Sequence, residues 1–318
     1  MERLIDLRSG PVQATLKILL KDKTTKKNII WATNTYKDLG DGFQDTDEIT
    51  ETCALDLNDS ILQPRASKSL EEQKERTRVK AEVMTPSWLC NKMNNYVDEC
   101  WFGNKNVFNT AKKHTWHTKL KKINFPEGKK WQDYVDSRRI EITCGEAPFL
   151  VSRYDTVTGE FIVPFSRRIG FLDRKMRIVN ENAEKHDEWL KWAFRALESC
   201  YGYEYQGDNL LIARINVLMS FHDCYVDKWG EEPNTCFLRK VANIIAWNLW
   251  QMDGLNGFTP PSVSHEKFHQ LELFDLQDDM GHELKEQTAI PCRIFNWRSN
   301  KSVRFEEIKG ECYEKEIF

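Results

Sequence analysis

Three short stretches of this 318-residue chain place an acidic side chain beside a glycine, and each follows an apolar segment. They are EITCGEAPF at residues 141–149, GYE at 202–204 and MDGL at 252–255. A glycine such as Gly145 lets a ligand approach the backbone closely. A carboxylate at Glu204 can accept two hydrogen bonds from a ribose diol, and one at Asp253 can accept a hydrogen bond from an exocyclic amine. Together the three stretches fit a nucleoside that carries an amino acid.

The first stretch also predicts local structure. Pro148 favours an extended conformation at Ala147 and suits the first turn of a helix. We therefore expect a helix to begin near residue 148, with free amide groups that would bind the carboxylate of the ligand. Cys144 is either a nucleophile or a small packed residue. No histidine is nearby in the sequence to act as its base, which favours the packed interpretation.

Strands and helices alternate through the middle of the chain, which predicts an α/β protein with a parallel sheet. The apolar segments before the first two acidic stretches are expected to be strands. Segments 187–200 and 207–221 are expected to be helices, and 238–255 a helix that runs into a short buried strand ending at Asp253. Ligands of such sheets bind at the carboxyl ends of the strands, so the three acids would share one site.

The N-terminal part has a different pattern. The first 35 residues are expected to be helical, residues 36–66 loop-rich, and residues 68–80 a charged helix with a favourable Glu72–Arg76 pair. Segment 82–102 predicts an amphipathic helix with Thr85 as N-cap and Pro86 as its first residue. Its apolar face consists of Leu89, Met93, Tyr96, Val97 and Cys100.

The composition, with 40% hydrophobic and 30% charged residues, is that of a globular protein. No run of about 18 apolar residues exists, and the first residues lack the pattern of a signal peptide. The nine cysteines are scattered without C-x-x-C spacing, which indicates reduced thiols in a cytoplasm and no disulfide framework.

Basic residues gather in segment 105–130, which has eight lysines and one glutamate, although the formal charge of the chain is only −3. Such a segment is either a patch that faces nucleic-acid phosphates or a solvated surface. The candidate nucleic-acid contacts are Lys112, Lys113, Trp116, Lys119, Lys121 and Lys122.

Two histidine pairs have the spacing at which a helix can present two metal ligands. They are His114 with His117 and His265 with His269. Neither belongs to an H-E-x-x-H pattern, and no third ligand is evident. Surface histidines are the favoured interpretation, so no metal site is predicted.

The order of the motifs resembles that of the adenine-N6 DNA methyltransferases of bacterial restriction–modification systems. In that family an F-T-P turn precedes a D-P-x-C-G-x-G-x-F loop, a G-x-E or G-x-D acid before a helix, and a D-x-L or D-G-L segment. Here EVMTP, EITCGEAPF, GYEYQGDNLLIARINVL and MDGL stand in that order within about residues 65–256. The chain departs from the pattern at Met84, Glu141, Ile142 and Ala147, where the family has an aromatic residue, Asp, Pro and Gly.

The resemblance implies a Rossmann-like methyltransferase sheet with S-adenosylmethionine as cofactor, Glu204 on the ribose and Asp253 facing the adenine. The cofactor-binding residues that it implies are Met84, Thr85, Pro86, Glu141, Thr143, Cys144, Gly145, Glu146, Ala147, Pro148, Phe149, Glu204, Tyr205, Asp253, Gly254 and Leu255.

The family's catalytic N-P-P-Y loop is missing. Its Asn side chain and a backbone carbonyl accept the hydrogens of the adenine amine, and its aromatic ring stacks on the flipped-out base. The one Pro-Pro pair, in FTPPSV at 258–263, has Thr259 in place of the Asn and Ser262 in place of the ring. We therefore identify no catalytic residue in this chain.

Two interpretations follow from that absence. The chain is either the cofactor-binding subunit of a split DNA methyltransferase of a restriction–modification or phage-defence system, or a pseudo-methyltransferase that acts as a DNA- or protein-binding regulatory module. In the first case a second polypeptide supplies the N-P-P-Y loop and the target-recognition part. The expected location is the cytoplasm of a bacterial or phage-infected cell.

The expected organisation is a helical N-terminal region at 1–81, a Rossmann-like core at 82–256 with an insertion at about 156–186, and a hairpin-like extension at 257–318. The sheet is expected to be incomplete, with an open edge after its third strand that the partner chain would complete. Trp247, Trp250 and Trp297 near that edge are candidate interface residues.

Overall fold

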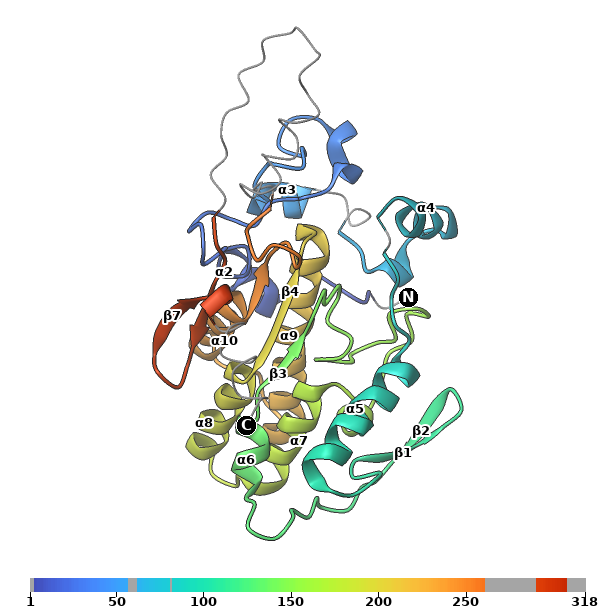
Figure 1. Ribbon diagram of the computed structural model, residues 1–318, viewed down its shortest axis with the longest axis vertical. Helices are drawn as coiled ribbons and strands as arrows, with labels where there is room; N and C mark the ends of the chain where they lie inside the picture. Colours follow the sequence, from blue (N-terminus) through green and yellow to red (C-terminus); the bar gives the residue numbers. More distant parts are fainter. Residues whose placement is uncertain (1–2, 57–61, 81, 261–289, 308–318) are drawn as a thin grey trace, which may run out of the picture.

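A small parallel sheet lies at the centre of the protein (Figure 1). The computed structural model describes residues 3–56, 62–80, 82–260 and 290–307. Strands β3 (Arg139–Glu141), β4 (Cys200–Glu204) and β5 (Leu249–Gln251) pair in the order β3-β4-β5, and both pairs are parallel. The predicted α/β class with a parallel sheet is confirmed.

Two helices connect each pair of neighbouring strands. Helices α7 (Phe171–Asn182) and α8 (His186–Glu198) lie between β3 and β4, and α9 (Gly207–Trp229) and α10 (Thr235–Asn248) lie between β4 and β5. In α8 the buried residues Trp189, Leu190, Ala193, Phe194 and Leu197 recur at helical spacing, so one face packs inward. Residues 207–218, the first three turns of α9, are all buried, so this helix lies in the core on all its sides.

Segment 156–186, expected as an insertion, contributes to this core. Its helix α7 buries Leu172, Met176 and Val179 in the main hydrophobic cluster and contacts α6, α8 and α9. A 3₁₀ helix, η3 (Phe165–Arg167), precedes it. The segment is therefore the first half of the β3–β4 crossover rather than a surface decoration.

The hairpin of β6 (Arg293–Asn296) and β7 (Lys301–Arg304) packs against the side of the sheet on which Tyr203 and Trp250 lie. Trp250 is 2% exposed and packs with Cys292 and Ile294 of this hairpin. Trp297 donates from its indole N–H to Asn248 Oδ1 at 2.7 Å, and the Trp247 ring lies 5.1 Å from that of Phe295. These three tryptophans thus pack within the chain and do not form the free interface that we expected.

The two edges of the sheet differ. At β5 the Leu249 carbonyl accepts hydrogen bonds from Arg214 at 3.0 and 2.7 Å, and the Gln251 carbonyl accepts one from Cys292 Sγ at 3.4 Å. At β3 no other strand of the described residues pairs with the outer edge, where Ile140 is 50% and Ile142 64% exposed. Among the described residues β3 and β5 are therefore both edge strands, as expected for β5, but the outward carbonyls of β5 are occupied within the chain, which favours β3 as the edge open to a partner.

The N-terminal helices are shorter than expected. They are α1 (Gly10–Gln13), α2 (Leu16–Leu19), the 3₁₀ helices η1 (Asn34–Leu39) and η2 (Arg65–Ser67), α3 (Glu51–Asp56) and α4 (Leu70–Lys80). Thr15 separates α1 from α2, and its hydroxyl donates to the Pro11 and Val12 carbonyls. Leu16 and Leu19 are fully buried, and α2 packs against α10.

Helix α5 (Ser87–Phe102) buries the face opposite to the expected one. Its N-cap is Pro86, one residue later than predicted, and its inward residues include Asn91, Asn94 and Asp98, whereas Met93 is 51% and Tyr96 68% exposed. The reason is a buried guanidinium: Arg174 of α7 bonds Asp98, Asn91 and Asn95. A buried cation requires polar partners, so the polar side of α5 faces inward.

Two smaller elements complete the described structure. Strands β1 (Asn109–Lys112) and β2 (Thr115–Thr118) form an antiparallel ribbon that projects beside α5, and α6 (Trp131–Asp136) leads into β3 (Figure 1). Among the described residues no helix has both the length and the apolar character that crossing a membrane requires.

Candidate functional site

The first two acidic stretches meet at the carboxyl ends of β3 and β4. The Gly145 amide donates to Glu204 Oε2 at 2.8 Å, and the Cys144 amide donates to the Tyr203 carbonyl at 2.8 Å. The third stretch follows the neighbouring strand, and the Met252 amide donates to the Glu204 carbonyl at 3.0 Å. The structure therefore brings Glu204 between the two other stretches, as the parallel order of the strands requires.

Glu204 holds the loop with its carboxylate. It is 8% exposed, and burial raises its pKa. Oε1 accepts hydrogen bonds from the Tyr205 and Gln206 amides at 3.0 and 3.1 Å, while Oε2 accepts one from Gly145. Two carboxylate oxygens offer about four acceptor positions. One position, on Oε2, is therefore left for a ligand hydroxyl.

The loop after β3 is held in an uncommon backbone conformation. Thr143, Gly145 and Ala147 have φ values of 45°, 52° and 65°. Glycine adopts this left-handed region freely, but a residue with a Cβ does so at a cost of roughly 1–2 kcal/mol. Two of these three residues carry a Cβ, so their conformation must be fixed by the contacts around them.

Glu141 supplies part of that fixation and corrects one prediction. No helix begins at Pro148; after β3 the next α-helix is α7. The Phe149 and Leu150 amides instead donate to the two Glu141 oxygens at 3.2 and 3.0 Å. The amide groups expected to bind a ligand carboxylate are thus occupied by the chain itself. Burial raises the pKa of Glu141 to about 8 although these hydrogen bonds lower it.

Cys144 has the packed role that the sequence favoured. Its side chain is 2% exposed, and burial raises the pKa of its thiol well above the ordinary value. A Cβ placed on Gly202 would lie 3.4 Å from its sulfur, so the thiol packs directly against the central strand. A buried thiol with a raised pKa is a poor nucleophile.

The Met84–Thr85–Pro86 turn lies against the same loop. Met84 is 9% exposed, and its sulfur would be 3.4 Å from a Cβ on Gly145. The Thr85 carbonyl accepts a hydrogen bond from Thr156 Oγ1 at 3.0 Å, which fixes the turn. The structure therefore joins the first two motifs of the family pattern in space.

Asp253 forms a turn at the end of β5. Oδ1 accepts the Leu255 amide and Oδ2 the Asn256 side-chain amide, both at 2.9 Å, so each oxygen keeps an acceptor position. Gly254 is required here, because a Cβ would lie 2.7 Å from the Tyr203 ring. Burial, and to a smaller extent the negative charges of Asp253 and Asp45, raise the pKa of Tyr205.

The remaining residues of the predicted site face the protein. Glu146 is 1% exposed and accepts hydrogen bonds from the Arg65 amide at 2.6 Å and the Tyr154 hydroxyl at 2.7 Å. Burial raises its pKa to about 7. Pro148 is buried, and Phe149 packs on a small apolar cluster with Cys90 and Trp116. By contrast, Leu255 is 86% and Tyr205 41% exposed at the mouth of the site.

A buried ionic network under the site had no signal in the sequence. Arg76 of α4 is 5% exposed and contacts Glu82 at 2.6 Å and Asp208 at 2.9 Å. Asp208 also accepts the Tyr36 hydroxyl at 2.6 Å. Glu72, which was predicted to pair with Arg76, instead accepts hydrogen bonds from the amide and the hydroxyl of Ser69 at the start of α4.

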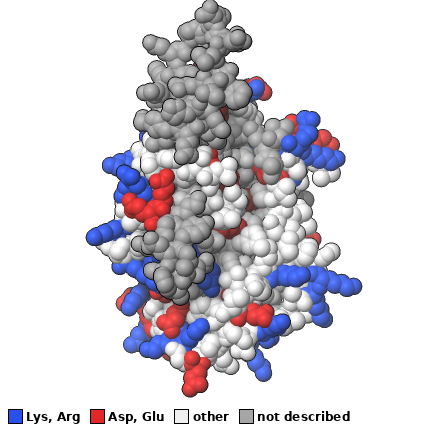
Figure 2. Space-filling view, in the orientation of Figure 1, with Lys and Arg blue, Asp and Glu red and all other residues white. Residues whose placement is uncertain are grey.

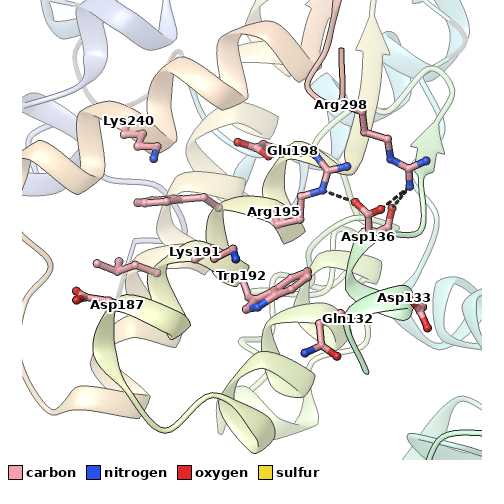
Figure 3. A pocket seen from close by; sticks show the side chains of 12 residues that line it. Gln132, Asp133, Asp136, Asp187, Lys191, Trp192, Arg195, Glu198, Lys240 and Arg298 are labelled. Carbon is pink, nitrogen blue, oxygen red and sulfur yellow. Dashed lines mark hydrogen bonds and ion pairs between the residues drawn. The ribbon is translucent and has the colours of Figure 1, made fainter. Parts of the chain in front are cut away.

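A groove lies elsewhere on the molecule. It has a volume of about 710 Å³ and is lined by residues of α6, α8 and α10 and by Arg298 (Figure 3). Asp136 joins Arg195 to Arg298 across it, with 2.5 Å to the latter. Asp136 comes shortly before β3 and Glu198 shortly before β4, so the groove lies toward the amino ends of the strands. Ligands of parallel sheets bind at the other end, and the groove is not the candidate site.

The predicted basic segment folds into the β1–β2 ribbon. Lys112, Lys113, Lys119, Lys121 and Lys122 are exposed, whereas Trp116 is buried and donates from its indole N–H to the Arg167 carbonyl at 2.9 Å. Trp116 therefore anchors the ribbon.

Of the two histidine pairs, His114 and His117 lie among the described residues. His114 lies in the ribbon turn and His117 in β2, not on a helix. No cluster of three potential metal ligands exists in the part of the chain that is described. His265, His269 and residues 261–263 of FTPPSV lie outside that part.

Comparisons with known proteins do not extend this picture. No family model, curated protein or solved structure matches the chain.

Proposed function

We propose that this chain is the S-adenosylmethionine-binding subunit of a split adenine-N6 DNA methyltransferase. One observation carries the proposal: the Gly145 loop and Glu204 are joined at the carboxyl ends of adjacent parallel strands, with the Met84 turn on one side. Three of the four short motifs thus contact one another, and the fourth, MDGL, follows the neighbouring strand, where the Met252 amide donates to the Glu204 carbonyl. The Rossmann-like methyltransferase fold is part of the proposal, and the order β3-β4-β5 is compatible with one half of such a sheet.

The residues present fit this cofactor at two points. The open acceptor position on Glu204 Oε2 would take one ribose hydroxyl, and a second would compete with the Gly145 amide for the same oxygens. Asp253 has an acceptor for the adenine amine, and Tyr205 and Leu255 offer exposed apolar surface to the ring. When bound, the cofactor supplies an electrophilic methyl group. The protein would orient the cofactor through these contacts.

The amino-acid end of the cofactor is the part that the described residues fit least well. The Phe149 and Leu150 amides are occupied by Glu141, so they do not offer a ready site for the amino-acid end of the cofactor. The exposed Thr143 and the half-buried Gly145 are the loop positions at which that end would approach the backbone. We therefore expect the loop to adjust when cofactor binds.

The same reasoning calls for a second polypeptide. Chemistry at adenine N6 needs acceptors for the amine hydrogens and a ring that stacks on the base. The resemblance places them on an N-P-P-Y loop, a motif this sequence lacks. The β3 edge, with exposed Ile140 and Ile142, is the place where a partner strand would pair.

Methyl transfer from labelled cofactor to duplex DNA tests this function. A reading frame beside the gene that encodes an N-P-P-Y or N-P-P-F loop identifies the partner to use. We expect transfer only when both polypeptides are mixed, and loss of transfer with Glu204→Ala. Transfer by this chain alone would disprove the split enzyme, and absence of transfer with every such partner would support the non-catalytic alternative.

A substitution on β3 tests whether the partner pairs with this edge of the sheet. Ile140→Lys should prevent assembly in size-exclusion chromatography, because a lysine replaces an apolar side chain on the pairing edge. Leu70→Lys is the matched control, since Leu70 is also exposed, at 68%, but lies on α4. Equal behaviour of the two variants would remove the β3 edge from the proposal.

A further inference from the structure

The β1–β2 ribbon is a basic element without carboxylates. Residues 104–123 contain six lysines and no aspartate or glutamate. Lys105 pairs with Glu99 at 3.6 Å, but the other five lysines take part in none of the salt bridges found among the described residues. Figure 2 shows a group of basic side chains at the right-hand edge of the molecule, the side on which Figure 1 shows the β1–β2 ribbon. A cluster of unpaired lysines repels itself and is stabilised by a polyanion.

The ribbon backbone is held firmly although its side chains are exposed. Trp116 is pinned by the Arg167 carbonyl, and Asn109 exchanges hydrogen bonds of 2.8 and 3.0 Å with Asn91 of α5. Arg177 donates to the Lys119 and Lys121 carbonyls at 2.6 and 3.2 Å. The lysines thus extend from a rigid base, so that ordering them on a ligand costs less entropy than in a free loop.

The ribbon also borders the candidate cofactor site. The His114 ring in its turn lies 4.6 Å from the Trp88 ring. Trp88 is in the first turn of α5, directly after the Met84–Thr85–Pro86 turn that contacts the Gly145 loop. A polyanion on the ribbon would therefore lie on the same side of the molecule as the site.

The shape of the element favours nucleic acid over an acidic protein. A two-stranded ribbon is one of the two structures that the major groove of DNA admits. The side chains of Thr110, Thr115 and His117 are exposed on it, and the tip carries Lys112 and Lys113. Lysines are flexible point charges suited to phosphates, and polar side chains beside them contact phosphates or base edges.

We propose that the β1–β2 ribbon, with Lys112, Lys113, Lys119, Lys121 and Lys122, is the surface on which this chain binds duplex DNA. The choice of partner rests on the proposed function. DNA binding is measured without cofactor, however, so its failure is distinct from a failure of cofactor binding.

Fluorescence anisotropy of a short labelled duplex, titrated with the full chain at salt concentrations from about 0.05 to 0.3 M, tests this inference. Each phosphate contact adds about 0.9 to the slope of log affinity against log salt concentration. One contact therefore strengthens binding about eightfold at 0.1 M salt relative to 1 M salt. Lys112→Ala/Lys113→Ala should therefore weaken binding about 60-fold at 0.1 M and reduce the slope by about 1.8. Lys185→Ala/Lys191→Ala, which removes two exposed lysines at α8 on the other side of the molecule (Figure 1), should change neither.

A second variant removes the three lysines that follow strand β2. Lys119→Ala/Lys121→Ala/Lys122→Ala should reduce the slope by about 2.7, and all variants should unfold at the wild-type temperature because the side chains are exposed. Equal slopes for the ribbon variants and the α8 control would overturn the inference. So would binding of a polyglutamate chain as tight as that of the duplex, which would assign the ribbon to an acidic protein surface.

Discussion

Arg76 is the residue whose replacement tests the packing beneath the site most sharply. Its guanidinium lies between Glu82 and Asp208, which are 7% and 0% exposed. Arg76→Ala would leave two buried carboxylates without their cation. Breaking a buried ion pair by removing one partner costs about 3–5 kcal/mol of the free energy of unfolding. We expect a loss of this size at pH 7.

The pH dependence of that loss follows from the pKa values. Burial works to raise the pKa of Asp208 and of Glu82, but Arg76 keeps both below their ordinary values. In the wild type these groups therefore contribute stability above the unfolded pKa, and the contribution is lost as the pH falls through the folded pKa. Without Arg76 the effect of burial remains, so the deficit of the variant should be largest near neutral pH and shrink below about pH 5.

Urea unfolding followed by tryptophan fluorescence at pH 7 and pH 4 measures both effects. Arg78→Ala is the matched control, because Arg78 lies on the same helix and its partner Glu75 is exposed. That variant should stay within about 0.5 kcal/mol of the wild type at both values of pH. Equal unfolding energies for the two variants at pH 7 would refute the reasoning.

Two further predictions concern a glycine and an acid of the site. In Gly207→Ala the new Cβ would lie 2.0 Å from the Ile30 carbonyl, so the variant should lose more than about 3 kcal/mol in thermal unfolding, whereas Gly10→Ala, with no atom within 4 Å, should change little. Burial raises the pKa of Glu141 to about 8, so between about pH 4.5 and pH 8 the folded state holds a proton that the unfolded state releases. The free energy of unfolding should therefore fall as the pH rises through this range, by at most about 1.4 kcal/mol per pH unit. Glu141→Gln should flatten this slope in urea unfolding, leaving the part due to Glu146 and Glu204, whose pKa values burial also raises; an unchanged slope would contradict the prediction.

The spacing of apolar residues along the sequence was sufficient to predict the central strands and helices. Strand β4 and helices α8, α9 and α10 occupy the predicted segments, because apolar residues at period 2 or 3.6 mark the buried sides of strands and helices. The parallel order of the strands then brings Glu204 beside Gly145. This part of the site follows from local pattern and one rule about parallel sheets.

The errors arose where a single side chain decided the outcome. Helix α5 turned its polar face inward because Arg174, from a distant segment, lies buried against it. A helix was expected at Pro148, but the chain forms turns there, and a buried carboxylate, that of Glu141, holds the Phe149 and Leu150 amides. Arg76 was expected to pair with Glu72 along the helix, whereas burial with Asp208 was available 132 residues away. Local rules give no information about such partners.

Cofactor binding tests the central claim most directly, by calorimetry of the full chain titrated with S-adenosylmethionine. We predict a saturable heat for the wild type. Glu204→Ala should bind roughly 10- to 100-fold more weakly, because it removes a charged acceptor worth about 1.5–3 kcal/mol. Asp253→Ala should also weaken binding, and Arg78→Ala should bind as the wild type does. The account would be contradicted if the wild type bound no cofactor at millimolar concentration, even with duplex DNA and the partner polypeptide present.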